Sequence, residues 1–294
     1  MLPEDEPAPG RDHSALGAGL PSRTALGAAR HRAAHQLLEA GWLFSDPLAV
    51  RILGDDGEAA LREAPMEGFG RALRLFIAAR SRLAEDALAD AVTQGVRQLV
   101  ILGAGLDTYA YRSPFAARLR IFEVDHPATQ AWKRDRLIAA AIRAPAALTF
   151  APVDFERQTL AEGLAAAGFD ASQATFFTWL GVVPYLTEAA VFATLAYIAA
   201  LPGGADVVFD YANPTAAVTG AARAGHAALA ARVAAAGENF RSYFDTDALC
   251  SRLAALGFRT VQDLGPPQIA ARFFPSRVGV MPDRGGHIVR AATR

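Results

Sequence analysis

The segment 98–125 constrains the fold of this chain more than any other part of the sequence. An apolar, β-like run, Gln98–Leu102, ends in the small residues Gly103-Ala104-Gly105, and a second apolar run, Leu119–Val124, ends in Asp125. The acid follows Gly103 by 22 positions, which is the distance that one crossover between parallel strands needs. Glycines allow a close backbone approach, and a carboxylate can accept hydrogen bonds from both ribose hydroxyls. The pattern predicts a nucleotide-ribose site.

The glycine turn differs from the fingerprint of dinucleotide-binding proteins. That fingerprint requires a third glycine at position 108, where the helix packs on the strand, and this chain has Thr108 preceded by Asp107. The sequence instead resembles the leucine carboxyl methyltransferase family over roughly residues 22–291. The blocks that carry the resemblance occur in the family's order: SRTALGAARHRAA (22–34), LGAGLDTYAYR (102–112), FEVDHPATQAWKRDRL (122–137), PVDFE (152–156) and WLGVVPYLT (179–187).

The resemblance implies an α/β fold of the Rossmann-like class I methyltransferase type. Its sheet would have seven mostly parallel strands, with the last strand antiparallel, and its cofactor would be S-adenosyl-L-methionine. The sequence itself alternates short apolar runs with helical stretches from residue 98 onward, which favours a largely parallel sheet covered by helices on both faces. We expect strands at 98–103, 119–124, 148–153, 175–180, 205–211, 258–264 and 287–292, and helices near 127–143, 157–167, 187–200, 215–236 and 245–256.

We interpret residues 1–21 as a flexible tail and 22–294 as one methyltransferase domain. Within it we expect a helical N-terminal extension at 22–97, a cofactor-binding core at 98–211, a lid insertion at 212–245 and the rest of the sheet at 246–294. Both the extension and the insertion would lie over the carboxyl ends of the strands, where ligands bind in such sheets. Together they would build the acceptor pocket and exclude water.

Composition narrows the class of protein further. Hydrophobic residues make up 52% of the 294 residues, which is enough for a substantial core, and a single cysteine excludes an internal disulfide. A net charge of −1 argues against nucleic-acid binding. No apolar stretch is long enough to span a bilayer, and the acidic start is unlike a secretory signal, so we expect a cytoplasmic protein that does not bind membranes. No cluster has metal-ligand spacing, and we expect no metal.

Arg80 is the most informative single residue outside the motifs. The apolar positions between 73 and 91 recur at helical spacing, and Arg80 falls on their stripe, whereas Arg74 and Arg82 fall off it. A guanidinium on a buried face requires an anion. The cofactor carboxylate fits that role, and the family resemblance implies it; an internal pair with an Asp or Glu is the alternative.

The resemblance assigns the remaining site residues. Gly103 and Gly105 would form the turn under the methionine part of the cofactor, and Asp125 would bind the ribose. Glu123 shares the strand face of Asp125 and is a weaker ribose candidate. A final group follows the third and fourth strands: Asp154 and the backbone N–H of Phe155 for the adenine (Asp154 alternatively as a helix N-cap), Leu180 beside the cofactor, and Tyr185, the candidate catalytic residue, facing the acceptor.

Two positions depart from relatives. Some family members carry an acid where this chain has Leu180, and others carry Arg where it has Tyr109, so the acceptor of the eukaryotic protein-methylating members does not transfer to this chain. We interpret His126 as orienting the turn beside the ribose. His31, His35 and His226 are interpreted as surface or packing residues.

The function that fits best is an S-adenosylmethionine-dependent O-methyltransferase acting on a carboxylate or hydroxyl of a small molecule or peptide. Two alternatives remain open at this point. A nicotinamide-dependent oxidoreductase is disfavoured by Thr108 and by the absence of a Tyr-x-x-x-Lys pair, since Lys133 is the only lysine. A non-catalytic cofactor-binding protein that regulates a partner is compatible with Leu180 and Tyr109. Neither the acceptor nor the oligomeric state follows from the sequence.

Overall fold

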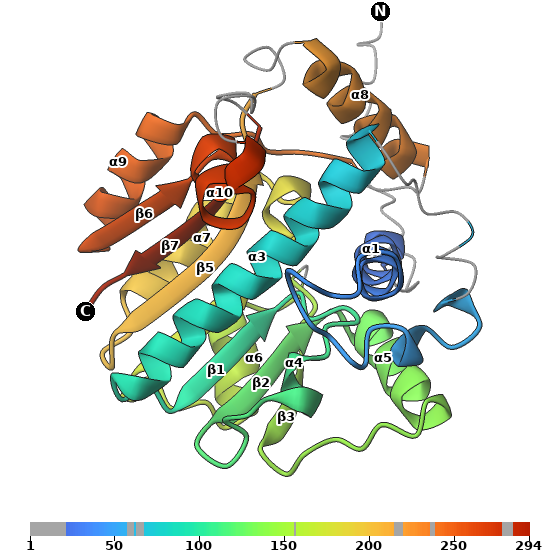
Figure 1. Cartoon of the computed structure of the whole chain (residues 1–294). Helices are drawn as coiled ribbons and strands as arrows, with labels where there is room; N and C mark the ends of the chain where they lie inside the picture. Colours follow the sequence, from blue (N-terminus) through green and yellow to red (C-terminus); the bar gives the residue numbers. More distant parts are fainter. Residues whose placement is uncertain are drawn as a thin grey trace, which may run out of the picture.

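A single seven-stranded sheet organises the protein (Figure 1). The computed structural model describes residues 22–57, 62, 68–155, 157–214, 220–235, 239–277 and 285–294. The strand order is β3-β2-β1-β4-β5-β7-β6, and β7 runs antiparallel to both of its neighbours. The strands are β1 (Gln98–Leu102), β2 (Arg120–Asp125), β3 (Leu148–Pro152), β4 (Thr175–Trp179), β5 (Ala205–Ala212), β6 (Thr260–Leu264) and β7 (Gly286–Ala292). The expected sheet, including its antiparallel last strand, is confirmed.

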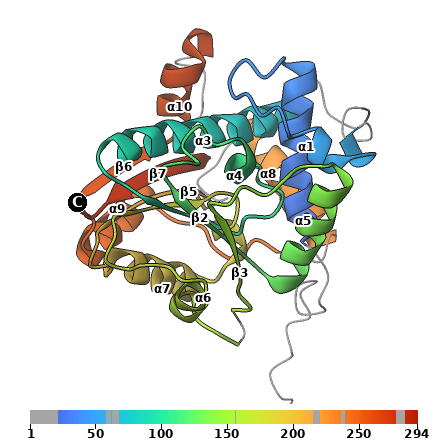
Figure 2. The same cartoon turned by 90° about the horizontal axis from the view of Figure 1, so that it is seen from below.

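Helices cover both faces of the sheet, which explains why the central strands are buried along almost their whole length (Figure 2). Side chains of α3, α4 and α10 pack in the core on one face. Those of α6, α7 and α9 pack on the other. The helices are α1 (Arg23–Leu38), α3 (Gly68–Thr93), α4 (Tyr109–Arg112), α5 (Pro127–Ala139), α6 (Leu160–Ala166), α7 (Glu188–Ala199), α8 (Gly220–Ala235), α9 (Thr246–Leu256) and α10 (Pro266–Phe273).

The expected helices are present within a few residues of their predicted bounds, while two short ones had no clear pattern. Helix α4 has only four residues, too few to complete an amphipathic repeat that sequence periodicity could reveal, and α10, with eight residues, falls between two expected strands where no helix was predicted. The expected tail, 1–21, and the first residues of the expected lid helix, 215–219, lie outside the described residues.

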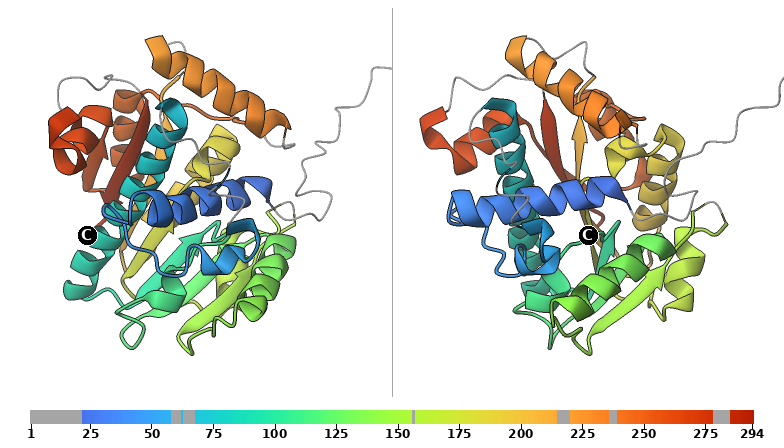
Figure 3. Two further views of the ribbon diagram at one scale, coloured as in Figure 1. Left: turned by 45° about the vertical axis from the view of Figure 1, so that its right-hand side comes forward. Right: turned by 90° about the vertical axis from the view of Figure 1, so that its right-hand side faces the viewer.

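The N-terminal extension packs beside the carboxyl ends of the parallel strands, as does α8 (Figure 3). Helix α1 begins at an N-cap, Ser22, whose backbone N–H donates to Thr129 Oγ1 of α5. Farther along, Ala29 and Ala33 pack with Leu106 and with Leu137 of α5 in a small apolar cluster. The extension is therefore anchored to the segment that follows β1 and to α5, which follows β2.

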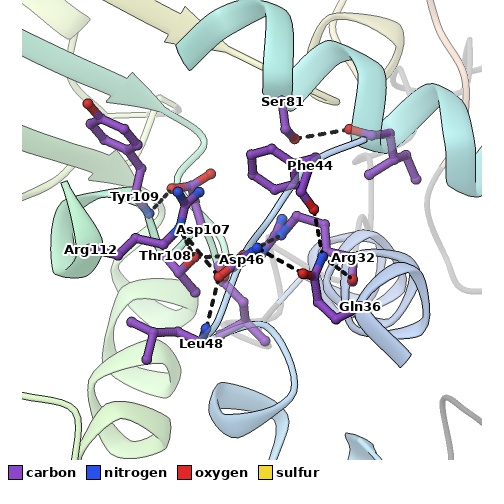
Figure 4. Close-up of polar contacts among 12 residues, drawn as sticks. Arg32, Gln36, Phe44, Asp46, Leu48, Ser81, Asp107, Thr108, Tyr109 and Arg112 are labelled. Atoms are coloured by element: carbon purple, nitrogen blue, oxygen red, sulfur yellow. Dashed lines mark hydrogen bonds and ion pairs between the residues drawn. The ribbon is translucent and has the colours of Figure 1, made fainter. Parts of the chain in front are cut away.

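A buried carboxylate, Asp46, holds the extension to the segment that follows the glycine turn (Figure 4). Its Oδ2 accepts from Thr108 Oγ1 at 2.7 Å, and its Oδ1 accepts from Leu48 N at 3.1 Å. Arg112 and Arg32 approach it at 3.3 and 3.6 Å. Arg32 also donates to Leu106 O at 2.5 Å. The extension thus fixes the backbone immediately after Gly105.

The buried face of α3 is wider than the apolar stripe in its sequence predicts, as Arg74 shows. Arg74 lies off the apolar positions, yet it is fully buried, because Glu39 accepts from its Nε at 2.8 Å and from its Nη2 at 2.7 Å. Glu39 also contacts His35, a packing histidine with a pKa lowered by burial. By contrast, Arg82 is exposed, as its position off the stripe indicated.

Replacing Asp46 with Ala should destabilise the protein by about 3–5 kcal/mol, because Arg32 and Arg112 would lose a buried counter-charge. Urea unfolding followed by circular dichroism measures the effect, and Asp55→Ala, at an exposed acid nearby, is the matched control with a change within about 0.5 kcal/mol. A loss for Asp46→Ala no larger than that of the control would contradict the anchoring role.

Candidate functional site

The turn after β1 is braced against the neighbouring strand. The backbone N–H groups of Gly103 and Ala104 both donate to Val124 O, at 2.9 and 3.1 Å. Gly103 has φ +64° and Gly105 has φ +43°, a left-handed conformation that glycine adopts without strain. A Cβ at Gly103 would lie 2.4 Å from Val182, and one at Gly105 would lie 2.9 Å from Ala25 of α1. Both glycines are thus required by close packing as well as by conformation.

Asp125 stands at the tip of β2 and is tied directly into this turn. Its Oδ2 accepts from Gly105 N at 2.5 Å, and its Oδ1 accepts from His126 N at 2.7 Å. Burial raises the pKa of Asp125, and the two backbone donors oppose that shift. His126 caps α5 by accepting from Ala128 N, so it shapes this turn as expected. Each carboxylate oxygen keeps a further lone pair for a ligand hydroxyl.

Asp154 and Phe155 follow the next strand, β3. The register pairs Asp125 with Pro152, so these two residues lie just beyond the neighbouring strand end. Asp154 is half-buried and lies 3.4 Å from Arg157, while 61% of Phe155 is exposed. The alternative role of Asp154 as a helix cap is wrong, because Thr159 caps α6 through a capping box with Glu162.

Arg80 points from α3 to the ends of β4 and β5, where it meets an acid that the sequence did not single out. Its Nη1 donates to Asp210 Oδ2 at 2.8 Å, and Asp210 Oδ1 accepts from Gly181 N at 2.6 Å. Arg80 is 8% exposed, and its Nε is buried with no hydrogen-bond partner among the described residues. The internal pair is therefore present, and it leaves the buried Nε donor without a partner among the described residues.

The WLGVVPYLT block places Leu180 and Tyr185 beside the same strand end. Leu180 lines a small cavity together with Tyr109, Asp107 and Ser81. Tyr185 ends a 3-10 turn, Val183–Tyr185, and α7 then begins at Glu188 with Thr187 as its N-cap.

An aromatic group that sequence reasoning missed lies next to Tyr185. Its ring centroid is 5.2 Å from that of Phe240, which in turn lies 6.3 Å from that of Tyr243. The segment that carries these aromatics is fixed to the 3-10 turn, because Arg241 N donates to Pro184 O at 2.7 Å. The signal available in the sequence was the cluster of aromatics in NFRSYF (239–244), which interrupts an Ala-rich stretch.

A second group that sequence reasoning missed holds the two ends of the expected lid insertion together. Asn213 Nδ2 donates to Phe244 O at 3.2 Å, and Asn213 Oδ1 lies 2.7 Å from His287 Nε2. The other ring nitrogen of His287 lies 2.6 Å from Asp263 Oδ1, and the ring stacks on Tyr211.

Of the other histidines, His226 lies in α8, and its side chain falls outside the described residues.

Glu123 is not a ribose ligand, which corrects the weaker of the two ribose predictions. It is fully buried, with Oε2 2.8 Å from Lys133 Nζ and 3.2 Å from Tyr111 Oη. Burial raises the pKa of Glu123 to about 7, although the ion pair with Lys133 opposes the shift. The strand alternation was right about the face, but α5 covers that face at Glu123 and leaves it partly open at Asp125.

Neither a group of metal ligands nor a membrane-spanning helix occurs among the described residues. In that part of the chain no three His, Cys, Asp or Glu side chains are grouped as a metal site would need. None of the helices described there combines the length and apolarity needed to cross a membrane.

Comparison with known proteins agrees with the geometry. The family model for leucine carboxyl methyltransferases matches residues 25–199, and the chain belongs to this family. A Bacillus subtilis protein named "Putative S-adenosyl-L-methionine-dependent methyltransferase YktD" is 36% identical over 205 residues, covering 68% of this chain and 66% of that protein. A similarly named Streptomyces coelicolor protein, SCO7813, is 37% identical, with coverages of 60% and 63%. The chain thus matches slightly less than two thirds of the length of these relatives.

A solved structure shares the fold at low sequence identity. The DUF574 family protein from Streptomyces avermitilis aligns with a TM-score of 0.53 at 14% identity, covering 90% of this chain and 97% of that one. The similarity confirms the Rossmann-like α/β fold.

The buried Glu123–Lys133 pair should make stability depend on pH. The raised pKa means that the folded chain keeps a proton on Glu123 between about pH 4.5 and 7, where the unfolded chain has released it. The stabilisation that this proton gives at low pH is therefore lost as the pH rises through about 7.

Measuring free energies of unfolding from pH 5 to 8 tests this dependence. The wild type should lose stability relative to the double variant Glu123→Gln/Lys133→Met, in which neither position titrates, by at most about 1.4 kcal/mol per pH unit. Parallel curves for the two proteins would show that Glu123 is ionised throughout.

Proposed function

We propose that this protein is an S-adenosylmethionine-dependent O-methyltransferase that acts on a carboxylate or hydroxyl of a small molecule or peptide. The observation that carries the proposal is the glycine turn hydrogen-bonded to Asp125 in a chain of this family. When bound, the cofactor supplies an activated methyl group on a sulfonium. The protein residues then have to bind, orient and exclude water.

The residues present suit this cofactor. Asp125 would accept from the ribose hydroxyls with its remaining lone pairs, and Asp154 with the backbone of Phe155 would bind the adenine. Gly103 and Gly105 let the backbone approach the methionine part, with Leu180 beside it. Arg80 would bind the carboxylate, and its Nε, which is buried without a partner among the described residues, is the donor that such an anion would satisfy.

The aromatic group Tyr185, Phe240 and Tyr243 would form one wall of the acceptor pocket. Burial raises the pKa of the Tyr243 hydroxyl, so this side chain stays neutral and is unsuited to act as a base near pH 7. Tyr185 would orient the acceptor. A carboxylate acceptor is already ionised near neutral pH and needs no base, which favours this acceptor class over an unactivated hydroxyl. Helices α1 and α8, beside the strand ends, would close the pocket against water.

Asp125→Ala should raise the dissociation constant for S-adenosylmethionine at least tenfold, because two hydrogen bonds to a charged acceptor are lost, each worth about 1.5–3 kcal/mol. Isothermal titration calorimetry on folded protein measures the change, with the largely exposed Asp90→Ala as the control. Unchanged affinity in a folded Asp125→Ala would overturn the ribose assignment. Tighter binding of NADH than of S-adenosylmethionine by the wild type would favour the oxidoreductase instead.

With an identified acceptor, the rate of the chemical step should be flat from about pH 6 to 8, because a carboxylate needs no deprotonation there. Single-turnover measurements give this rate, and Tyr185→Phe should lower it only modestly. A steep rise with pH that one histidine variant such as His126→Ala abolishes would point to a base-assisted hydroxyl acceptor. Cofactor binding without turnover on a broad acceptor panel would favour a non-catalytic role.

A further inference from the structure

The side chain of Asp210 accepts two hydrogen bonds from groups outside its own strand, β5. The side chain is 5% exposed at the carboxyl end of β5, and each of its oxygens accepts one hydrogen bond from a different element. Oδ2 accepts from Arg80 Nη1 of α3 at 2.8 Å, and Oδ1 accepts from Gly181 N, just after β4, at 2.6 Å. The carboxylate is therefore held in one orientation and holds the guanidinium in turn.

Gly181 gives this guanidinium its room. The glycine has φ +73°, and a Cβ built on it would lie 2.6 Å from Arg80 Nη2 and 3.1 Å from Nη1. The guanidinium thus packs closely against the backbone just after β4. Any side chain at position 181 would displace it.

The two edges of the guanidinium are used unequally. Asp210 takes the Nη1 corner, whereas Nε, on the opposite side-on edge, is buried without a partner among the described residues. A side-on edge of Nε and Nη2 matches a carboxylate in a two-bond arrangement. Since a buried charged donor is costly to leave unpaired, the arrangement indicates a second anion at this edge.

We propose that Asp210 is a positioning residue, which fixes Arg80 so that the side-on edge of the guanidinium faces the α-carboxylate of the bound cofactor. The inference rests on the proposed function and extends it to a residue that does not itself contact the cofactor. Asp210 acts through its hold on the Nη1 corner, and Gly181 acts by leaving the guanidinium space. Loss of Asp210 should therefore weaken only ligands that carry the amino-acid carboxylate.

Calorimetry with two nucleosides tests this role. S-adenosylhomocysteine carries the amino-acid end, and 5′-methylthioadenosine lacks it while keeping the adenine, ribose and sulfur. Asp210→Asn should raise the dissociation constant for S-adenosylhomocysteine about tenfold and leave that for 5′-methylthioadenosine within about twofold. The matched control is Asp206→Asn, which alters a buried acid paired with Arg294 at the other end of the same strand and should change neither constant.

A double-mutant cycle separates positioning from a general loss of structure. Arg80→Lys alone should weaken S-adenosylhomocysteine, and adding Asp210→Asn to it should change the constant by less than about twofold, because the edge that Asp210 orients is already gone. If Asp210→Asn does not fold, Gly181→Ala supplies the same comparison by displacing the guanidinium.

The remaining outcomes of these binding measurements would contradict either the positioning role of Asp210 or the proposed function. Equal loss of both ligands would make Asp210 a structural residue, and tighter binding of S-adenosylhomocysteine would make it a competitor for Arg80; either result overturns the inference, as does unchanged binding. A wild-type protein that binds neither nucleoside would instead refute the proposed function.

Discussion

The hydrogen bond from Gly105 N to Asp125 Oδ2 is the contact on which the site depends. It joins the end of β1 to the end of β2 at the point where the chain turns away from the sheet. With the two bonds from Gly103 and Ala104 to Val124 O, it fixes both the open backbone of the turn and the direction of the carboxylate. In the proposed function, two adjacent strands would thereby present a nucleoside-binding surface before any ligand arrives, which would reduce the ordering cost of binding.

Buried charges hold the N-terminal extension to this turn, in addition to its apolar contacts. Asp46, Arg32 and Arg112 lie at the junction between the extension and the segment after the glycine turn. Buried ion pairs contribute little net stability compared with apolar contacts, but breaking one is costly. Such a junction tolerates few alternative arrangements, and it holds α1 close enough that Gly105 has no room for a side chain. We infer that the extension serves to position the turn as well as to cover it.

The sequence predicted what depends on local pattern and missed what depends on distant partners. Apolar runs ending in glycine or acid placed the strands, and the spacing from Gly103 to Asp125 placed the turn beside the acid. Helical periodicity put Arg80 on the buried face of α3, where the structure finds it. The same periodicity could not show that Arg74 is buried by Glu39, nor that α5 covers Glu123. These partners lie in other segments, and only the tertiary fold brings them together. Asp210, which lies 130 positions after Arg80, escaped for the same reason.

A crystal structure with S-adenosylhomocysteine would test the assembled site most directly. The ribose hydroxyls should lie within hydrogen-bond distance of Asp125, and the amino-acid carboxylate should meet the side-on edge of Arg80 while Asp210 keeps the Nη1 corner. A nucleoside bound away from the β1–β2 turn, or a carboxylate that leaves Arg80 Nε without a partner, would contradict the site described for this protein.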